Sequence, residues 1–304
     1  MSHNEDATLT ASLDLLRRLP PDQISANLDS LVNILEPDTA DDLLSSVDQP
    51  LKIAHSSTSR DYLICDYNRD GDSYRSPWTN EYTPALTDGT TPSANLRKLE
   101  IAMNQAFDVY RDLYYEGGLS SVYLWDTEET TSGAAFAGVV LLKKSTDSND
   151  STASWDSIHV FESIPPSSTS SSAAAGRTCG YKLTSTVMLS MSKPITTSTA
   201  SSTTTSSTEG QVNLGGSMTR QHESTGPLDT SSNENVRSSH IENLGKMIEE
   251  MEIKMRNLLA EVYFSKTKDI VGTLRNGQGF GVANQQKLLQ GELVGLLRGR
   301  KIAN

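Results

Sequence analysis

The chain is poor in the residues on which covalent cross-links, metal sites and catalysis depend. It has two cysteines, Cys65 and Cys179, which lie far apart and indicate neither a disulfide framework nor a Cys-rich metal motif. Its five histidines show no ligand or acid–base spacing, and no nucleophile-elbow, Walker or zinc-protease motif occurs. We therefore predict a protein that is not an enzyme, with no cofactor and no metal site.

Long apolar runs are also missing, because none approaches the roughly 20 residues needed to cross a bilayer. The acidic N-terminus lacks the basic and apolar regions of a signal peptide, which predicts a cytosolic location. The net charge of −12 argues against nucleic acid as a partner. That charge is uneven: residues 275–304 hold five basic residues and one Glu, so a tail of +4 follows a body of −16.

What the chain does have is a long apolar stripe between about Val236 and Leu274. A second apolar set, which includes Met247, Ile253 and Leu259, widens the stripe beyond a coiled-coil seam. A helix of this length would span about 60 Å, so we expect part of it to pack against another subunit. The stripe consists of seven residues at alternating spacings of three and four, the spacing of one helix face: Ile241, Leu244, Ile248, Met251, Met255, Leu258 and Val262.

The preceding residues predict an α+β fold. Three short leucine-striped segments, separated by prolines, predict a helical stalk over residues 1–48. Residues 49–118 are expected to form a globule with one long helix, Ser93–Glu116. Strand-type patterns follow in succession, so residues 119–222 predict a five-stranded antiparallel meander, with a linker and the long helix over residues 223–274. The five expected strands are 121–125, 136–144, 155–164, 180–193 and 211–221.

Ser/Thr-rich tracts interrupt this sheet region at residues 145–154, 165–176 and 196–210. They show no apolar periodicity, so we predict solvated loop insertions there. At the other end of the chain, residues 275–304 predict an amphipathic tentacle behind a Gly-rich hinge, Gly277–Gly281. Its leucine face consists of Leu289, Leu293, Leu296 and Leu297, whereas glycines occupy the opposite side and weaken the free helix.

One loop, residues 66–77, resembles a calcium-binding EF-hand loop. Asp66, Asn68 and Asp70 match its first three ligand positions (1, 3 and 5) and Gly71 matches the glycine at position 6, but Pro77 stands where a bidentate Glu is required. A calcium-binding module is therefore kept as an alternative to a polar loop that presents carboxylates to a partner. A purely structural scaffold subunit is a second alternative.

Several blocks of the sequence are long and unusual in composition: Leu15–Pro21, Leu43–Ala54, Cys65–Trp78, Trp155–Val160, Tyr181–Leu189, Asn213–Ser217 and Lys266–Val271. These blocks resemble the beta subunit of F-actin capping protein, and the similarity extends over nearly the whole chain apart from the Ser/Thr tracts and the tail.

The resemblance implies the capping protein heterodimer fold, in which an obligate alpha subunit of similar fold shares the central sheet and the long helix lies across that sheet. It implies binding to the barbed end of actin filaments, independent of calcium, in the cytoplasm and the cortical actin cytoskeleton. Subunit addition and loss at that end would both stop, without any chemistry. Members of the family also occur in dynactin, so dynactin is a further candidate partner.

The resemblance also implies particular site residues. Arg220, Lys254 and Arg256 match basic positions that contact actin, and the Arg256 position is tied to inhibition by phosphatidylinositol bisphosphate. Asp48 and Asp66 match carboxylates that receive basic side chains of capping-protein-interaction motifs, as in regulators of the CARMIL type. The tail departs from the family through its glycines; the residues predicted to reach actin there are Leu289, Leu293, Leu296, Leu297, Arg298 and Arg300.

Overall fold

The structure is a computed structural model. The chain divides into two compact units, residues 1–249 and 250–304. No helix among the described residues combines the length and apolar composition needed to span a bilayer. The described residues are 2–16, 18–19, 23–127, 135–148, 151–164, 177–201, 204–261, 265, 268 and 287–290.

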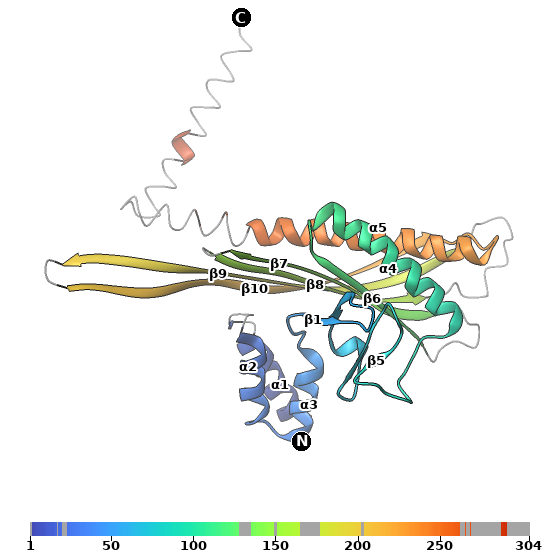
Figure 1. Ribbon diagram of the computed structural model, residues 1–304, viewed down its shortest axis with the longest axis horizontal. Coiled ribbons are helices and arrows are strands. Elements are labelled where there is room, and N and C mark those ends of the chain that lie inside the picture. Colours follow the sequence, from blue (N-terminus) through green and yellow to red (C-terminus); the bar gives the residue numbers. More distant parts are fainter. Residues whose placement is uncertain are drawn as a thin grey trace, which may run out of the picture. The chain divides into compact units, whose positions relative to one another are not determined.

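The first unit opens with the predicted stalk (Figure 1). Its helices are α1 (Ser2–Leu16), α2 (Ile24–Val32) and α3 (Pro37–Ser46). Proline is favoured at the start of α3 because an N–H in the first turn of a helix has no acceptor within the helix, so its absence costs no hydrogen bond. The helices pack on a small apolar core of Leu16, Leu28, Leu43 and Val47. This core joins three short helices, each of which would be only marginally stable in isolation.

A globule of short strands follows. It contains the hairpin of β1 (Lys52–His55) and β2 (Asp61–Ile64) and the three-stranded sheet of β3 (Arg69–Asp70), β4 (Ser73–Arg75) and β5 (Tyr82–Thr83). The sequence does not predict these strands, because strands of two to four residues are too short to show an alternating pattern.

The predicted five-stranded antiparallel meander is confirmed, with strand order β10-β9-β8-β7-β6. The strands are β6 (Leu119–Asp126), β7 (Phe136–Ser148), β8 (Ser151–Ile164), β9 (Thr178–Ser201) and β10 (Thr204–Pro227). All five are longer than predicted, and β9 and β10 form a long ribbon (Figure 1).

Two of the three predicted Ser/Thr loops are corrected by the strand register. Ser145–Ser148 of β7 pairs with Ser151–Ser154 of β8, and Thr196–Ser201 of β9 pairs with Thr204–Glu209 of β10. Their low hydrophobicity predicted loops, but a ladder is formed by backbone groups, and β-branched Thr favours extended structure. The third tract, 165–176, lies outside the described residues.

The two faces of the sheet are covered by different elements. On one face Tyr123, Val139, Leu141 and Ile158 form a core with Leu63 of the β1–β2 hairpin. The other face carries helix α4 (Ala94–Tyr114) along β6, and the first part of α5 (Asn233–Leu259), where His240 meets Phe136 and Tyr181 edge-on. Alternating side chains of each strand therefore serve two cores.

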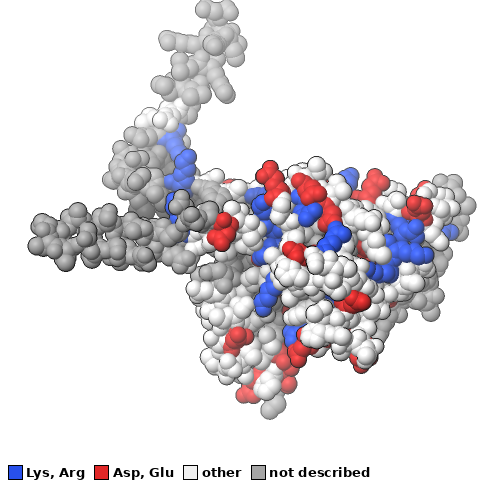
Figure 2. Space-filling model, in the orientation of Figure 1, with Lys and Arg blue, Asp and Glu red and all other residues white. Residues whose placement is uncertain are grey.

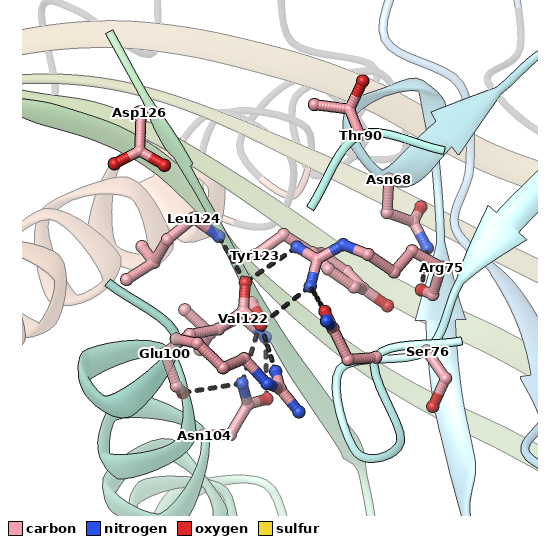
Figure 3. Close-up of polar contacts among 12 residues, drawn as sticks. Asn68, Arg75, Ser76, Thr90, Glu100, Asn104, Val122, Tyr123, Leu124 and Asp126 are labelled. Atoms are coloured by element: carbon pink, nitrogen blue, oxygen red, sulfur yellow. Dashed lines mark hydrogen bonds and ion pairs between the residues drawn. The ribbon is translucent and has the colours of Figure 1, made fainter. Parts of the chain in front are cut away.

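Helix α4 also closes the outer edge of β6 with its own side chains (Figure 3). The Asn104 amide donates to the Val122 carbonyl and accepts from the Val122 N–H, both at 2.9 Å. The fully buried Glu100 carboxylate accepts from the Leu124 N–H at 2.7 Å. Backbone groups that would otherwise be unpaired are thereby satisfied, so this edge is not open to another strand.

Glu100 also holds the globule to the sheet. Its two oxygens accept from Nη1 and Nη2 of Arg75 on β4 at 2.9 and 2.8 Å, and Arg97 forms a further ion pair with it (Figure 3). The Glu100 hydrogen bonds hold the pKa of Arg75 above its ordinary value, although burial acts in the opposite direction. A buried carboxylate is tolerated here because it receives two guanidinium groups and one backbone N–H.

Glu100→Gln is expected to lower the free energy of unfolding by about 3–5 kcal/mol, because the buried Arg75 would keep its charge without a counterion. Urea denaturation of the protein, purified together with the subunit expected to cover its long helix and followed by tryptophan fluorescence, measures the change. Asp112→Asn is the matched control on α4, since Asp112 is exposed and ion-paired only at the surface, and it should cost less than about 1 kcal/mol. Equal urea concentrations at the midpoint of unfolding for the two variants would contradict this role of Glu100.

The long helix is present as α5, shorter in the described residues than the predicted 236–274. Of the predicted stripe, Leu244, Ile248, Met251 and Met255 are buried and Ile241 and Leu258 are half-buried, whereas Val262 lies outside the described residues. In the second set Met247 and Leu259 are buried but Ile253 is 53% exposed. The helix thus has an exposed apolar residue in addition to its buried stripe.

Candidate functional site

Asp48 and Asp66, the two carboxylates predicted to receive a basic ligand, line one small cavity of about 110 Å³. Asp48 follows the end of α3, and Asp66 opens the short 3-10 helix η2 (Asp66–Asn68) after β2. The cavity therefore lies where the stalk joins the globule. The structure brings together two residues that are 18 positions apart in the sequence.

The electrostatics of this cavity favour a cation. Burial raises the pKa of Asp48; a hydrogen bond with Thr186 lowers it, and the charge of Asp66 raises it further. The Asp66 side chain is 63% exposed, and its described ion pair with Arg69 is loose, at 3.9 Å. A cation placed between the two carboxylates would relieve their mutual repulsion.

An aromatic pair beside the carboxylates was missed by the sequence analysis. Tyr67 stacks on Trp125 of β6, with ring centroids 5.9 Å apart and an angle of 8° between the rings, and Tyr67 is 41% exposed. Burial, with Asp48 next, raises the pKa of Tyr67 to about 12, so the phenol stays neutral. An exposed aromatic face next to carboxylates suits a guanidinium group. The only sequence signal was an aromatic residue between polar ones.

The loop that resembles an EF-hand is held by its own hydrogen bonds. The Asn68 amide is buried, where it accepts from the Cys65 N–H and donates to the Arg75 carbonyl, both at 2.9 Å. Asp70 accepts from the Thr90 N–H at 3.2 Å. Two of the three expected ligands are thus engaged elsewhere, and no group of three or more acidic, His or Cys side chains in the described part of the chain could hold a metal ion. This geometry does not favour the calcium alternative.

The described stalk has a strongly acidic character. Residues 1–48 contain ten acidic and two basic residues. In Figure 2 the stalk, at the bottom of the view, shows mostly red side chains among white ones. The cavity therefore adjoins a surface with the same negative sign, which extends the region that attracts a basic segment.

The predicted basic positions lie in both units. Arg220 is exposed on β10 in the first unit. In the second unit Lys254 is exposed on α5, whereas Arg256 is half-buried and pairs with the buried Glu252 at 3.5 Å. Residues two apart do not share a helix face, so the structure does not bring Lys254 and Arg256 together.

The tail is described only at Lys287–Gln290, a short helical piece in which Leu289 is 63% exposed. The other tail residues predicted to reach actin, Leu293, Leu296, Leu297, Arg298 and Arg300, lie outside the described residues.

Comparison with known proteins assigns this architecture to one family. The family model "F-actin capping protein, beta subunit" matches residues 9–271. An F-actin-capping protein subunit beta of Aspergillus oryzae is 48% identical over 291 residues, covering 95% of this chain and 97% of the relative. The Drosophila melanogaster subunit beta is 50% identical over 296 residues, covering 97% and 96%.

Among solved structures, the homodimeric actin capping protein alpha subunit from Plasmodium berghei aligns with a TM-score of 0.44 and 14% identity, covering 90% of this chain and 97% of that one.

Proposed function

The chain belongs to the family of F-actin capping protein beta subunits, and we propose that it joins an alpha subunit to cap the barbed ends of actin filaments. Capping would block both the addition and the loss of actin subunits, by binding alone and independently of calcium. The observation that supports this most strongly is 48–50% identity to F-actin-capping beta subunits over at least 95% of the chain. We place its action in the cytoplasm, at cortical actin, with dynactin as a further candidate assembly.

The two edges of the sheet support a partner subunit. Side chains of α4 close the β6 edge, whereas no described strand pairs with the outer edge of the 24-residue β10. A long open edge is a template for another chain, and natural proteins cover such edges. We therefore propose that a strand of the alpha subunit pairs with β10.

The register indicates which β10 groups face that partner. Val122 exchanges hydrogen bonds with Asn104 on the outer side of β6, so it is not a hydrogen-bonded partner of Val140 on β7. In an antiparallel sheet, the backbone groups of successive residues face alternately one neighbouring strand and the other. When this alternation is followed through the residue pairs from β7 to β10, the backbone groups of Met218 and Arg220 face β9. The N–H groups of Ser217, Thr219 and Gln221 then face outward.

Gel filtration of the chain co-expressed with an alpha subunit tests the assembly. The expected result is a single 1:1 complex, whereas the chain expressed alone should aggregate through its open edge. A monodisperse monomer at micromolar concentration would contradict the proposed heterodimer.

For actin contact we propose the exposed basic residues Arg220 and Lys254, together with Arg256 and the tail. Their positive charge suits the acidic surface of actin, and the same charge at Arg256 suits inhibition by phosphatidylinositol bisphosphate. The leucines Leu289, Leu293, Leu296 and Leu297, with Arg298 and Arg300, would form a docking helix that orders on binding.

For regulation we propose that the Asp48–Asp66 cavity receives an arginine of a capping-protein-interaction motif, as in regulators of the CARMIL type. Two carboxylates, the exposed face of Tyr67 and the acidic stalk support this proposal. A planar guanidinium can bond carboxylates and stack on an aromatic ring at once, which an ammonium group does less well.

Asp66→Ala is expected to weaken an arginine-containing interaction-motif peptide by about 1–3 kcal/mol, roughly 5- to 150-fold, because a charge-assisted hydrogen bond is lost. Capping should be nearly unchanged. Fluorescence anisotropy of a labelled peptide measures the first, and a seeded pyrene-actin assay measures the second.

Asp72→Ala is the matched control, because Asp72 is a fully exposed carboxylate of the same loop that does not line the cavity. Equal losses in the two variants would show that only the general negative charge of the loop matters. A melting temperature that rises with calcium, and no longer rises in Asp66→Ala, would support the calcium alternative instead.

A further inference from the structure

A second cavity, of about 260 Å³, lies in the first unit where the N-terminal ends of α4 and α5 meet the sheet. Its apolar wall includes Leu96 and Leu99 of α4, Phe136 of β7 and Val236 of α5. Its polar lining includes Asp126, Arg237 and His240. Ligand sites are typically concave and mostly apolar, with a few polar groups that orient the ligand. Neither actin contact nor the Asp48–Asp66 cavity uses any of these residues.

His240 presents a hydrogen-bond donor toward this cavity. Burial lowers the pKa of His240 to about 4, so the ring is neutral near pH 7, and only 5% of the residue is exposed. The Tyr181 hydroxyl lies 2.8 Å from His240 Nδ1 and accepts from the Asn243 amide at 3.3 Å. When the Tyr181 hydroxyl donates to Nδ1, the neutral ring carries its proton on Nε2, and no described residue accepts a hydrogen bond from it. An acceptor oxygen of a ligand in the cavity would satisfy this donor.

Arg237 adds a positive charge to the same side of the cavity. It is three residues before His240, so both side chains lie on one face of α5. The guanidinium is half-buried and makes no ion pair with a described residue. The one carboxylate of the lining, Asp126, is already engaged, since its two oxygens accept from the N–H and the hydroxyl of Ser93 at 2.8 Å each.

We propose that this cavity binds a small aromatic carboxylate, whose oxygens accept from His240 Nε2–H and Arg237 while its ring packs on Leu96, Leu99, Phe136 and Val236. The helix N-termini of α4 and α5 favour the same negative charge. A cavity of about 150 Å³ holds benzene. The cavity of about 260 Å³ therefore accommodates a single aromatic ring or two fused rings.

Isothermal titration of the full chain, purified with its alpha subunit, tests the proposal with 2-naphthoate as the probe and 2-naphthamide as its uncharged analogue. The carboxylate should bind saturably and at least about 10-fold more tightly than the amide, because hydrogen bonds to charged groups are the stronger ones. Arg237→Gln should lower the naphthoate affinity about 10-fold and leave the naphthamide affinity unchanged.

Lys246→Gln is the matched control, an exposed cation of α5 that does not line the cavity, and it should change neither affinity. Val236→Trp should abolish binding of both probes by filling the apolar wall, with folding checked by the melting temperature. The proposal is overturned if naphthoate shows no saturable binding, if Arg237→Gln and Lys246→Gln behave alike, or if a folded Val236→Trp variant binds as the parent does. If Val236→Trp does not fold, the Arg237→Gln variant still decides the test, because Arg237 is half-exposed and its substitution should not disturb folding.

Discussion

Ser217→Pro is expected to abolish co-purification of the chain with an alpha subunit. The N–H of Ser217 faces the open edge of β10, and proline both removes that donor and places its ring toward the incoming strand. One partner carbonyl would be left unsatisfied and the strand displaced, so we expect affinity between the subunits to fall at least about 100-fold. Affinity purification through a tag on the alpha subunit, with the two chains quantified on a gel, measures the effect.

Two further variants separate the lost N–H from other causes. Ser217→Ala keeps the backbone donor and removes an exposed hydroxyl, so co-purification should be retained. Met218→Pro removes a donor on the side of β9 and should destabilise the β9–β10 pair itself. If Ser217→Pro co-purified as well as Ser217→Ala, the alpha subunit would not pair with this edge.

Deletion of Val282–Asn304 is expected to weaken capping by about one to three orders of magnitude. Burying even two of the tail leucines contributes about 3–6 kcal/mol, from which the cost of ordering a Gly-rich helix must be subtracted. The loss should appear mainly as faster dissociation from the barbed end, because basic residues of the body still steer the encounter. Dilution-induced depolymerisation of capped filaments measures the dissociation rate, and dimer formation should be unaffected.

Point variants locate this effect on the leucine face. Leu293→Asp combined with Leu296→Asp should reproduce much of the loss, whereas Gly295→Ala should leave capping unchanged or slightly tighter, since alanine stabilises a helix by about 1 kcal/mol relative to glycine. An unchanged dissociation rate in the deletion variant, together with loss of capping in Arg256→Glu, would assign capping to the body alone.

The elements predicted correctly from the sequence are those long enough to show a repeating pattern. Helix α4 and the five strands of the meander are 8 to 24 residues long, enough for a helical or alternating pattern to show. The small strands β3 and β5, of two residues each, have no such pattern and depend on contacts made after folding. The Ser/Thr ribbon was mistaken for loops because backbone pairing leaves no hydrophobic signature.

The candidate sites were predictable only in part. The proposed roles of Asp48 and Asp66 come from resemblance to a family, and the residues themselves offer only a calcium-loop pattern. The stack of Tyr67 on Trp125 joins residues 58 positions apart, and Arg75 meets Glu100 across 25 positions. Sequence spacing carries no signal for such pairs, because the intervening strands and helices place them.

Single-filament fluorescence microscopy of actin growth tests the central claim most directly. With nanomolar heterodimer of this chain and an alpha subunit, barbed ends should stop growing and shrinking while pointed ends continue, equally in calcium and in a calcium chelator. Unchanged barbed-end growth, despite a well-formed 1:1 complex, would contradict the claim.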